Sequence, residues 1–114
     1  MNSITLFMRD LKLASVLSDH IAIMDKGVEI HENLDDFSLS SKLAFIDLDE
    51  NDFGSVDFIS SLFAKAKNIK IIGFLSSMQK DKVDKFKSAG CTMVLTKSSA
   101  VKNISSLVKE FGNN

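Results

Sequence analysis

The sequence has 114 residues, 45% of them hydrophobic, and a formal net charge of -1, which fits a single domain over residues 1–114 with one core. No apolar run approaches the roughly 20 residues that cross a bilayer, and the N-terminus lacks the pattern of a secretory signal, so we expect a cytoplasmic protein. The lone Cys91 excludes an internal disulfide, and no cluster of cysteine and histidine has the spacing of a zinc site.

The N-terminal part of the chain alternates strand-length apolar runs with a segment of helical periodicity. This pattern is typical of βαβ units around a parallel sheet. A strand is predicted at residues 4–8, followed by a helix with an apolar stripe that Gly27 is expected to end. Residues 28–31 alternate in polarity as an edge strand does, and residues 34–41 allow only a short or irregular second helix.

The rest of the chain continues the alternation, with strands predicted at residues 43–46, 69–75 and 93–96. The first of these runs is apolar throughout, and the second is apolar apart from Lys70 near its start, so both of their faces should be covered by helices and they should lie in the centre of the sheet. The helices between the strands carry apolar residues at helical spacing, and the fourth helix is expected to end at Gly90. A last helix should begin at a cap on Ser98 or Ser99.

A charged residue follows each of two predicted strands, Asp47 after residues 43–46 and Lys97 after residues 93–96. Parallel strands place their C-terminal ends along one edge of the sheet, and ligands of open α/β sheets bind at that edge. An acid and an ammonium that are far apart in sequence are therefore expected to meet in one pocket.

This arrangement of five strand and helix pairs, with Asp47 and Lys97 at strand ends, resembles the receiver domain of bacterial and archaeal two-component response regulators over essentially the whole chain. The resemblance implies an α/β, flavodoxin-like, doubly wound three-layer sandwich with five parallel strands in the order 2-1-3-4-5 and helices on both faces. It also implies phosphoryl transfer in a phosphorelay. Asp47 is similar to the phosphoacceptor, Lys97 to the cation that pairs with the phosphoryl group, and Ser76 to the hydroxyl of that site.

Receivers hold a divalent cation with two acidic residues after the first strand, where this chain has Arg9 and Asp10. The resemblance implies a Mg²⁺ site built from Asp10, Asp47 and Asp49, in which an arginine replaces one acidic ligand and weakens metal binding. We therefore expect no required cofactor. Two interpretations of Arg9 stay open: it forms an ion pair with Asp47 and fills the pocket without a ligand, or it is a cation of the loop that faces solvent.

Three functions are compatible with these residues. The leading hypothesis is a stand-alone atypical receiver, or pseudo-receiver, that regulates a partner through protein–protein contacts with weak or no metal-dependent phosphorylation. The second is a working receiver in two-component signal transduction that a histidine kinase phosphorylates on Asp47, and the third is an assembly module that keeps only the receiver fold. None of them is an enzyme beyond self-phosphorylation and dephosphorylation at Asp47. Dinucleotide and P-loop motifs are absent, and no loop suited to flavin mononucleotide follows the first strand.

The charge is divided unequally along the chain: residues 1–57 hold 4 Lys and Arg against 12 Asp and Glu, and residues 58–114 hold 10 against 3. The two halves therefore attract each other within the fold or present a basic face to an acidic partner. The fourth and last predicted helices carry the lysines of this face: Lys80, Lys82, Lys85, Lys87, Lys102 and Lys109. An acidic partner or a second copy would fit it. Nucleic acid is not expected, because the chain has one arginine and no recognition-helix motif.

Overall fold

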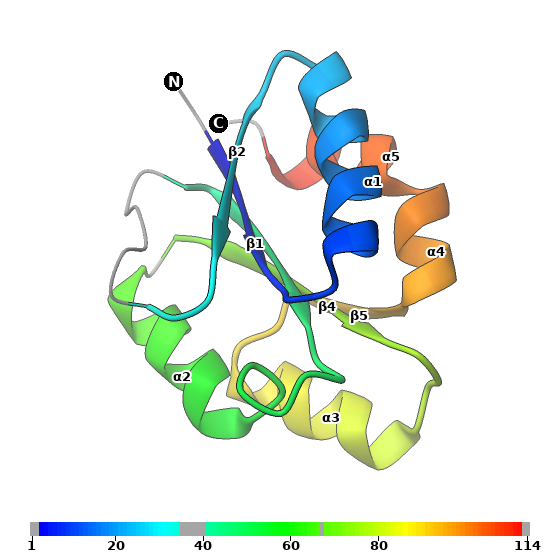
Figure 1. The fold of residues 1–114 in the computed structure, drawn as a ribbon. Coiled ribbons are helices and arrows are strands. Elements are labelled where there is room, and N and C mark those ends of the chain that lie inside the picture. The colour runs from blue at the N-terminus through cyan, green and yellow to red at the C-terminus, as the bar shows by residue number, and fades with distance from the viewer. Residues whose placement is uncertain (1–2, 35–40, 67, 113–114) are drawn as a thin grey trace.

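The computed structural model describes residues 3–34, 41–66 and 68–112. Its centre is one parallel sheet with the strand order β2-β1-β3-β4-β5 (Figure 1), which confirms the predicted α/β class and strand order. The strands are β1 (Ser3–Phe7), β2 (Gly27–His31), β3 (Leu43–Asp47), β4 (Lys70–Leu75) and β5 (Met93–Thr96). The short second helix predicted at residues 34–41 falls largely on residues 35–40, which lie outside the described residues.

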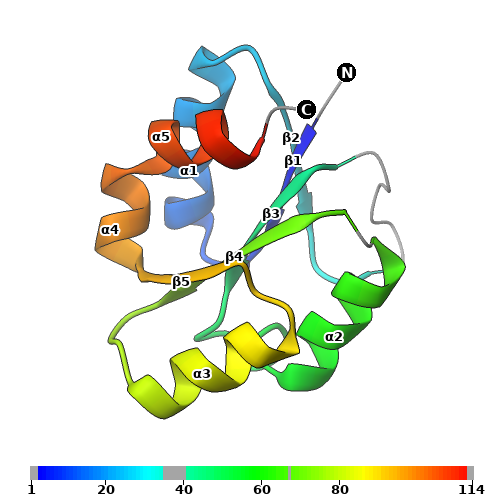
Figure 2. The same ribbon diagram turned by 180° about the vertical axis from the view of Figure 1, so that it is seen from behind.

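Helices cover both faces of the sheet and complete the predicted three-layer sandwich. One face carries α1, α4 and α5, and the other carries α2 and α3 (Figures 1 and 2). The helices are α1 (Leu11–Ile23), α2 (Val56–Lys65), α3 (Lys80–Ala89), α4 (Lys97–Lys102) and α5 (Ile104–Phe111).

Two hydrophobic clusters, one on each face of the sheet, hold the layers together. On the side of α1 and α5, Phe45 stacks on Phe74 with ring centroids 5.3 Å apart, and Leu17 belongs to the same cluster. On the side of α2 and α3, the cluster includes Leu62 and Phe86. Every residue of β3 is buried, as expected for a central strand that has helices on both sides.

Gly73 in β4 lets two side chains pack closely against the sheet. A Cβ at this position would lie 2.4 Å from Cδ1 of Leu48 and 3.6 Å from Sγ of Cys91. Cys91 is 6% exposed, and burial raises the pKa of its thiol to about 12. Cys91 therefore behaves as a small buried hydrophobic residue.

The prediction that Gly27 ends the first helix is wrong. Helix α1 ends at Ile23, and the chain turns at Asp25, whose φ of 63° lies in the left-handed region. Aspartate tolerates this conformation better than most residues that carry a Cβ. Gly27 instead opens β2, which lies at the edge of the sheet as predicted. Gly90 does end α3 as predicted, with a φ of 140°.

The predicted last helix is two helices, α4 and α5, which meet at Asn103. The predicted cap on Ser98 or Ser99 is also wrong. Thr96 caps α4, because its Oγ1 accepts a hydrogen bond of 3.1 Å from the backbone N–H of Ser99. The cap on Thr96 places Lys97 in the first turn of α4, and the division at Asn103 ends this helix after Lys102.

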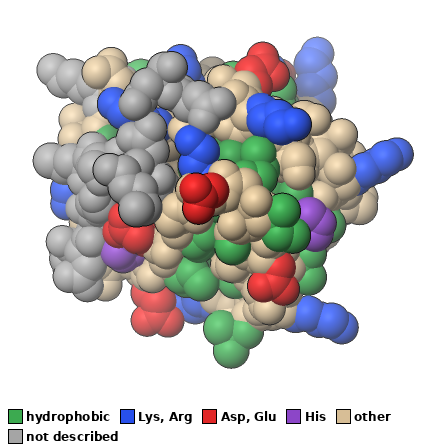
Figure 3. Space-filling view, turned by 90° about the horizontal axis from the view of Figure 1, so that it is seen from above, with side chains coloured by type: hydrophobic (Ala, Val, Ile, Leu, Met, Phe, Trp, Pro, Cys, Tyr) green, Lys and Arg blue, Asp and Glu red, His purple; other side chains and the backbone are tan. Residues whose placement is uncertain are grey.

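The face seen from above in Figure 3 carries both signs of charge, interspersed with hydrophobic and neutral side chains. On this face the unequal charge of the two halves of the sequence does not produce a patch of one sign. In the part of the chain that the structure describes, no helix has the length and apolar character needed to span a membrane.

Candidate functional site

The C-terminal ends of β3 and β5 bring an acid and a lysine into contact. Asp47 is the last residue of β3, and Lys97 directly follows β5, with β4 between the two strands. The Nζ of Lys97 lies 3.1 Å from Oδ1 of Asp47. Asp47 is 5% exposed, so the ammonium neutralises a carboxylate that has little water around it. The two charges that end distant strands are therefore joined in one ion pair.

Asp49 and Ser76 complete a set of hydrogen bonds around Lys97. The same Nζ lies 3.1 Å from Oδ2 of Asp49. Ser76, directly after β4, donates to this oxygen twice, from Oγ at 2.5 Å and from its backbone N at 2.8 Å. The backbone N–H of Asp49 donates to Oδ1 of Asp47 at 3.0 Å. We call Asp47, Asp49, Ser76 and Lys97 the strand-end network.

The loop that carries Asp49 is held by backbone hydrogen bonds and by two buried side chains. The carbonyl of Glu50 accepts from the backbone N–H of Phe53 at 3.0 Å and from that of Gly54 at 2.8 Å. Leu48 and Phe53 are buried in the cluster on the side of α2 and α3. Because both ends of the loop are anchored, the carboxylate of Asp49 is held within reach of the loop that follows β4.

Hydrogen bonds outweigh the cost of burial for both Asp49 and Lys97. Burial alone would raise the pKa of Asp49, but the hydrogen bonds from Ser76 and Lys97, together with the lysine charge, lower this pKa below its ordinary value of 3.8. Burial alone would lower the pKa of Lys97, but the carboxylates of Asp49 and Asp47 raise it above its ordinary value of 10.5. Both groups are therefore charged at neutral pH.

We expect the protein to lose stability in acid as Asp49 becomes protonated. Because the pKa of Asp49 in the folded protein lies below 3.8, its contribution is present above about pH 3.8 and is lost as the pH falls through the lower folded value. Urea unfolding between about pH 6 and pH 2.5 measures this loss. The Asp49→Asn variant should lose less stability than the wild type over the same range, and an equal loss would contradict the assignment to Asp49.

Arg9 lies with the acidic side chains of the loop after β3. Its guanidinium forms an ion pair with Asp52 and a second, at 3.1 Å, with Glu50, and its Nε lies 3.9 Å from Glu32. The guanidinium also lies over the ring of Phe53, 5.2 Å from the centroid. The hydrogen bond to Asp52 and the surrounding negative charge raise the pKa of Arg9.

Of the two interpretations of Arg9, the ion pair with Asp47 is wrong. Lys97 supplies the cation that neutralises Asp47, and a second cation at this place would be repelled by the first. The exposed and half-buried carboxylates near Arg9 are better partners, because the guanidinium can bind them while it stays in contact with water. Arg9 therefore adds positive charge beside the strand-end network and not within it.

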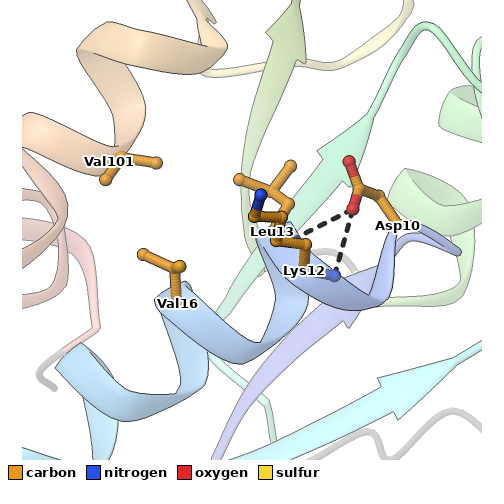
Figure 4. Close-up of a pocket in the computed structure, with 5 residues that line it drawn as sticks. All are labelled: Asp10, Lys12, Leu13, Val16 and Val101. Carbon is orange, nitrogen blue, oxygen red and sulfur yellow. Dashed lines mark hydrogen bonds between the residues drawn. The ribbon is translucent and has the colours of Figure 1, made fainter.

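Asp10 caps α1, since its Oδ1 accepts hydrogen bonds of 3.1 Å from the backbone N–H groups of Lys12 and Leu13. The same residues border an open pocket of about 260 Å³. Figure 4 shows Val16 of α1 facing Val101 of α4 across this pocket, with Asp10 at one end. The lining is mainly apolar, and the carboxylate of Asp10 serves the helix end.

The aspartates of the implied magnesium site do not form a suitable ligand set. Asp47 and Asp49 each accept from Lys97, and Asp10 is used as a helix cap. A divalent cation needs several free oxygens in a near-octahedral arrangement, and here it would lie beside an ammonium. Within residues 3–34, 41–66 and 68–112, no group of three or more acidic, histidine or cysteine side chains is placed to hold a metal ion. The donor set in this arrangement does not fit Mg²⁺.

Two sets of contacts could not be assigned from the sequence. The sequence predicts Asp49 as a metal ligand and does not predict its hydrogen bonds to Ser76. These bonds form because the two residues closely follow the neighbouring strands β3 and β4. Asp52 was not expected to bind Arg9. The sequence does show a run of acidic residues between positions 47 and 52. This run offers several possible partners to each cation, but it does not indicate which carboxylate each cation binds.

Solved structures of response regulators share this fold. A two-component response regulator from Clostridium difficile superposes with a TM-score of 0.84 at 13% sequence identity, over 96% of this chain and 94% of that chain. The receiver domain of Ssk1 from Saccharomyces cerevisiae, in complex with the histidine phosphotransfer protein Ypd1, gives a TM-score of 0.79 at 15% identity, over 98% of this chain and 88% of that chain.

A response regulator from Burkholderia pseudomallei with a phosphorylated aspartic acid, a calcium ion and citrate gives a TM-score of 0.75 at 15% identity. The match covers 92% of this chain, which spans 64% of the length of that chain. No model of a protein family matches the sequence, and no curated protein matches it either. The protein therefore has the flavodoxin-like fold of receiver domains, established by structural likeness at low sequence identity.

Proposed function

We propose that this protein is a cytoplasmic signalling domain of the atypical receiver type, which acts by binding another protein and is not an enzyme. In this proposal it needs neither a divalent metal nor phosphorylation of Asp47. The observation that carries the proposal is the closed strand-end network. In this network Lys97 is shared between Asp47 and Asp49, and Oδ2 of Asp49 also accepts from Ser76, so a carboxylate that could help to hold a divalent cation is already engaged.

The charges around the network also support a site that works without a metal. Phosphoryl transfer brings negative charge to the acceptor, and divalent cations usually neutralise it. Here Lys97 is shared between two carboxylates, and Arg9 is held by Glu50 and Asp52. A metal that entered would have to displace one of these cations or be repelled by both.

A working receiver is the second candidate, and the position of Asp47 favours it. Asp47 ends the central strand β3, and Ser76 and Lys97 follow β4 and β5 at the same edge of the sheet. The Burkholderia response regulator carries a phosphorylated aspartic acid and a calcium ion. In this alternative the partner is a histidine kinase or a phosphotransfer protein, as Ypd1 is in the complex with Ssk1.

The partner that we propose is acidic, and its binding surface is the exposed face of α3. Four exposed lysines lie on this helix, and they outnumber its two aspartates: Lys80, Lys82, Lys85 and Lys87. Complementary charge would speed association with an acidic protein or with the acidic half of a second copy. Lys102 and Lys109 lie on α4 and α5, on the opposite face of the sheet (Figure 2), so a partner that also reaches them must pass around the edge at β5.

Incubation with acetyl phosphate tests the proposed function directly. Wild type and Asp47→Ala are incubated with and without Mg²⁺, and their intact masses are compared with that of a known receiver treated in parallel. We expect no phosphoryl adduct on the wild type under conditions that label the known receiver, because the engaged carboxylates and the cations Lys97 and Arg9 disfavour the divalent metal that phosphoryl transfer uses. An adduct that appears only with Mg²⁺ and only when Asp47 is present would overturn the proposal and establish a working receiver.

A further inference from the structure

Helix α2 exposes two large apolar side chains on one side. Phe63 is 45% exposed and Val56 is 39% exposed. They stand seven residues apart, close to two turns of an α-helix, so they share one face with the exposed Ser60 between them. We call Val56, Ser60 and Phe63 the α2 stripe. Single apolar residues are normal on a protein surface, but two that are aligned on one helix leave apolar area that a partner can cover.

The ring of Phe63 is held beside the end of α3. A Cβ at Gly90 would lie 3.1 Å from both Cβ and Cγ of Phe63, so the glycine lets this side chain lie close to the end of that helix. The backbone N–H of Gly90 donates to the carbonyl of Lys87, the last lysine of α3. Helices α2 and α3 pack side by side on one face of the sheet (Figure 2). Because Phe63 is already restrained by this packing, it loses little freedom when a partner covers it.

Positive charge surrounds the α2 stripe. Lys65 follows Phe63 near the end of α2, where Asp57 is the acid of the first turn, and α3 adds four exposed lysines against two aspartates. Two of these lysines, Lys80 and Lys87, also stand seven residues apart and therefore share one side of α3. An apolar centre with a polar rim is typical of protein interfaces. A partner that covers Phe63 meets ammonium groups around it and needs acidic residues there.

A second copy of this chain does not meet that need. In a closed dimer with its two-fold axis at Phe63, Lys65 and Lys87 of one molecule would face the same lysines of the other, and like charges repel. Among the described helices, none carries more acidic residues than lysines. The acid Asp52, in the loop before α2, is held by Arg9. An acidic helix that packs on α2 must therefore come from another protein.

We propose that the α2 stripe and the lysines of α3 form one docking surface for an acidic amphipathic helix of another protein. Apolar residues at three- and four-residue spacing on that helix cover Val56 and Phe63, and its carboxylates meet the lysines. The inference rests on the proposed function, which assigns an acidic partner to α3, and it adds α2 and an apolar contact. Lys102 and Lys109 lie outside this surface, on the opposite face of the sheet (Figure 2).

A synthetic peptide tests this surface. The probe is a helix of alanine, glutamate and leucine with one tryptophan, in which the leucines lie on one face, and a scrambled peptide of the same composition lacks that face. Because the chain has no tryptophan or tyrosine, tryptophan emission reports the peptide alone. We expect the wild type to bind the probe at least about tenfold more tightly than the scrambled peptide. Equal affinities, or no binding of the probe below about 1 mM, would overturn the proposal.

Variants of the α2 stripe test the apolar contact. Phe63→Ser should weaken binding of the probe about tenfold, whereas Phe63→Leu should retain most of the affinity because leucine keeps an apolar side chain. Ile23→Ser is the matched control, since Ile23 is exposed on α1 across the sheet (Figure 1), and it should bind as the wild type does. If circular dichroism shows that Phe63→Ser does not fold, Val56→Ser should weaken binding about threefold. Unchanged affinity in the folded stripe variant would refute the apolar contact and the proposal.

Charge reversal tests the lysines of α3. Replacement of Lys80 and Lys87 by glutamate should weaken binding about tenfold at low ionic strength and by less at high salt. The same reversal at Lys102 and Lys109 should have little effect, and an equally large loss there would contradict the proposed position.

Two other results are distinguished from these. Dimers of the wild type in sedimentation that Phe63→Ser abolishes would assign the face to a second copy and overturn the proposal. Failure of the proposed function is recognised separately, since it requires labelling of wild-type Asp47 by acetyl phosphate.

Discussion

Replacement of Gly54 by alanine should lower the free energy of unfolding by about 3 kcal/mol. A Cβ at this position would lie 2.0 Å from the carbonyl oxygen of Leu48 and 2.8 Å from its carbonyl carbon. Both are backbone atoms, so the loop between them must shift as a unit, and the shift would move Asp49 away from Ser76. Because the chain has no tryptophan or tyrosine, urea unfolding is best followed by circular dichroism.

Asn51→Ala is the matched control for the Gly54 variant. Asn51 is exposed in the same loop, and its replacement should change the free energy of unfolding by no more than about 0.5 kcal/mol. A loss of less than about 1 kcal/mol for Gly54→Ala would show that the loop accommodates the methyl group. The close approach to Leu48 would then not be a constraint on the site.

Replacement of Lys97 by methionine should destabilise the protein by about 2 kcal/mol at pH 7, because it leaves the buried carboxylate of Asp47 without a cation. The expected loss is smaller than for a fully buried pair, since the side chain of Lys97 is 27% exposed and that of Asp47 is 7% exposed. Two carboxylates would also be left without the ammonium that separates their charges. Urea unfolding of the variant and the wild type measures the difference.

A double-mutant cycle separates the energy of the ion pair between Lys97 and Asp47 from the other effects of removing Lys97. In an Asp47→Asn background, Lys97→Met should cost less by about 1 kcal/mol, because the neutral amide needs no cation. Lys102→Met, at an exposed position of the same helix, should change stability by no more than about 0.5 kcal/mol. Equal losses for Lys97→Met in both backgrounds would exclude a contribution from the ion pair.

Most of the fold could be predicted because burial leaves a periodic pattern in the sequence. The apolar runs of β3 and β4 correctly indicated central strands, and the polar alternation of β2 correctly indicated an edge strand. Helix ends were harder. Asp25 and Asn103 end or divide helices through local backbone geometry, and neither leaves a mark in hydrophobic periodicity. The cap on Thr96 was missed because three hydroxyl residues in close succession compete for that position.

Within the site, only the contacts that follow from the pairing of the strands could be predicted from the sequence. Parallel pairing alone brings the end of β3 close to the end of β5, so the contact between Asp47 and Lys97 followed from the strand ends. The partners of Arg9 and Asp49 could not be found in this way. Several carboxylates lie within reach of each cation at similar energetic cost, and the choice among them depends on loop geometry that the sequence does not display.

The close packing around Gly73 limits how copies of this chain can associate. Cys91 shares the space beside this glycine with Leu48, and with a pKa of about 12 its thiol stays protonated at neutral pH. Only the thiolate attacks a disulfide, and only an accessible sulfur can be attacked. While β4 and α3 remain packed, no covalent bridge can join two molecules through this sulfur. The packing beside Gly73 therefore keeps Cys91 of the folded chain out of disulfide exchange.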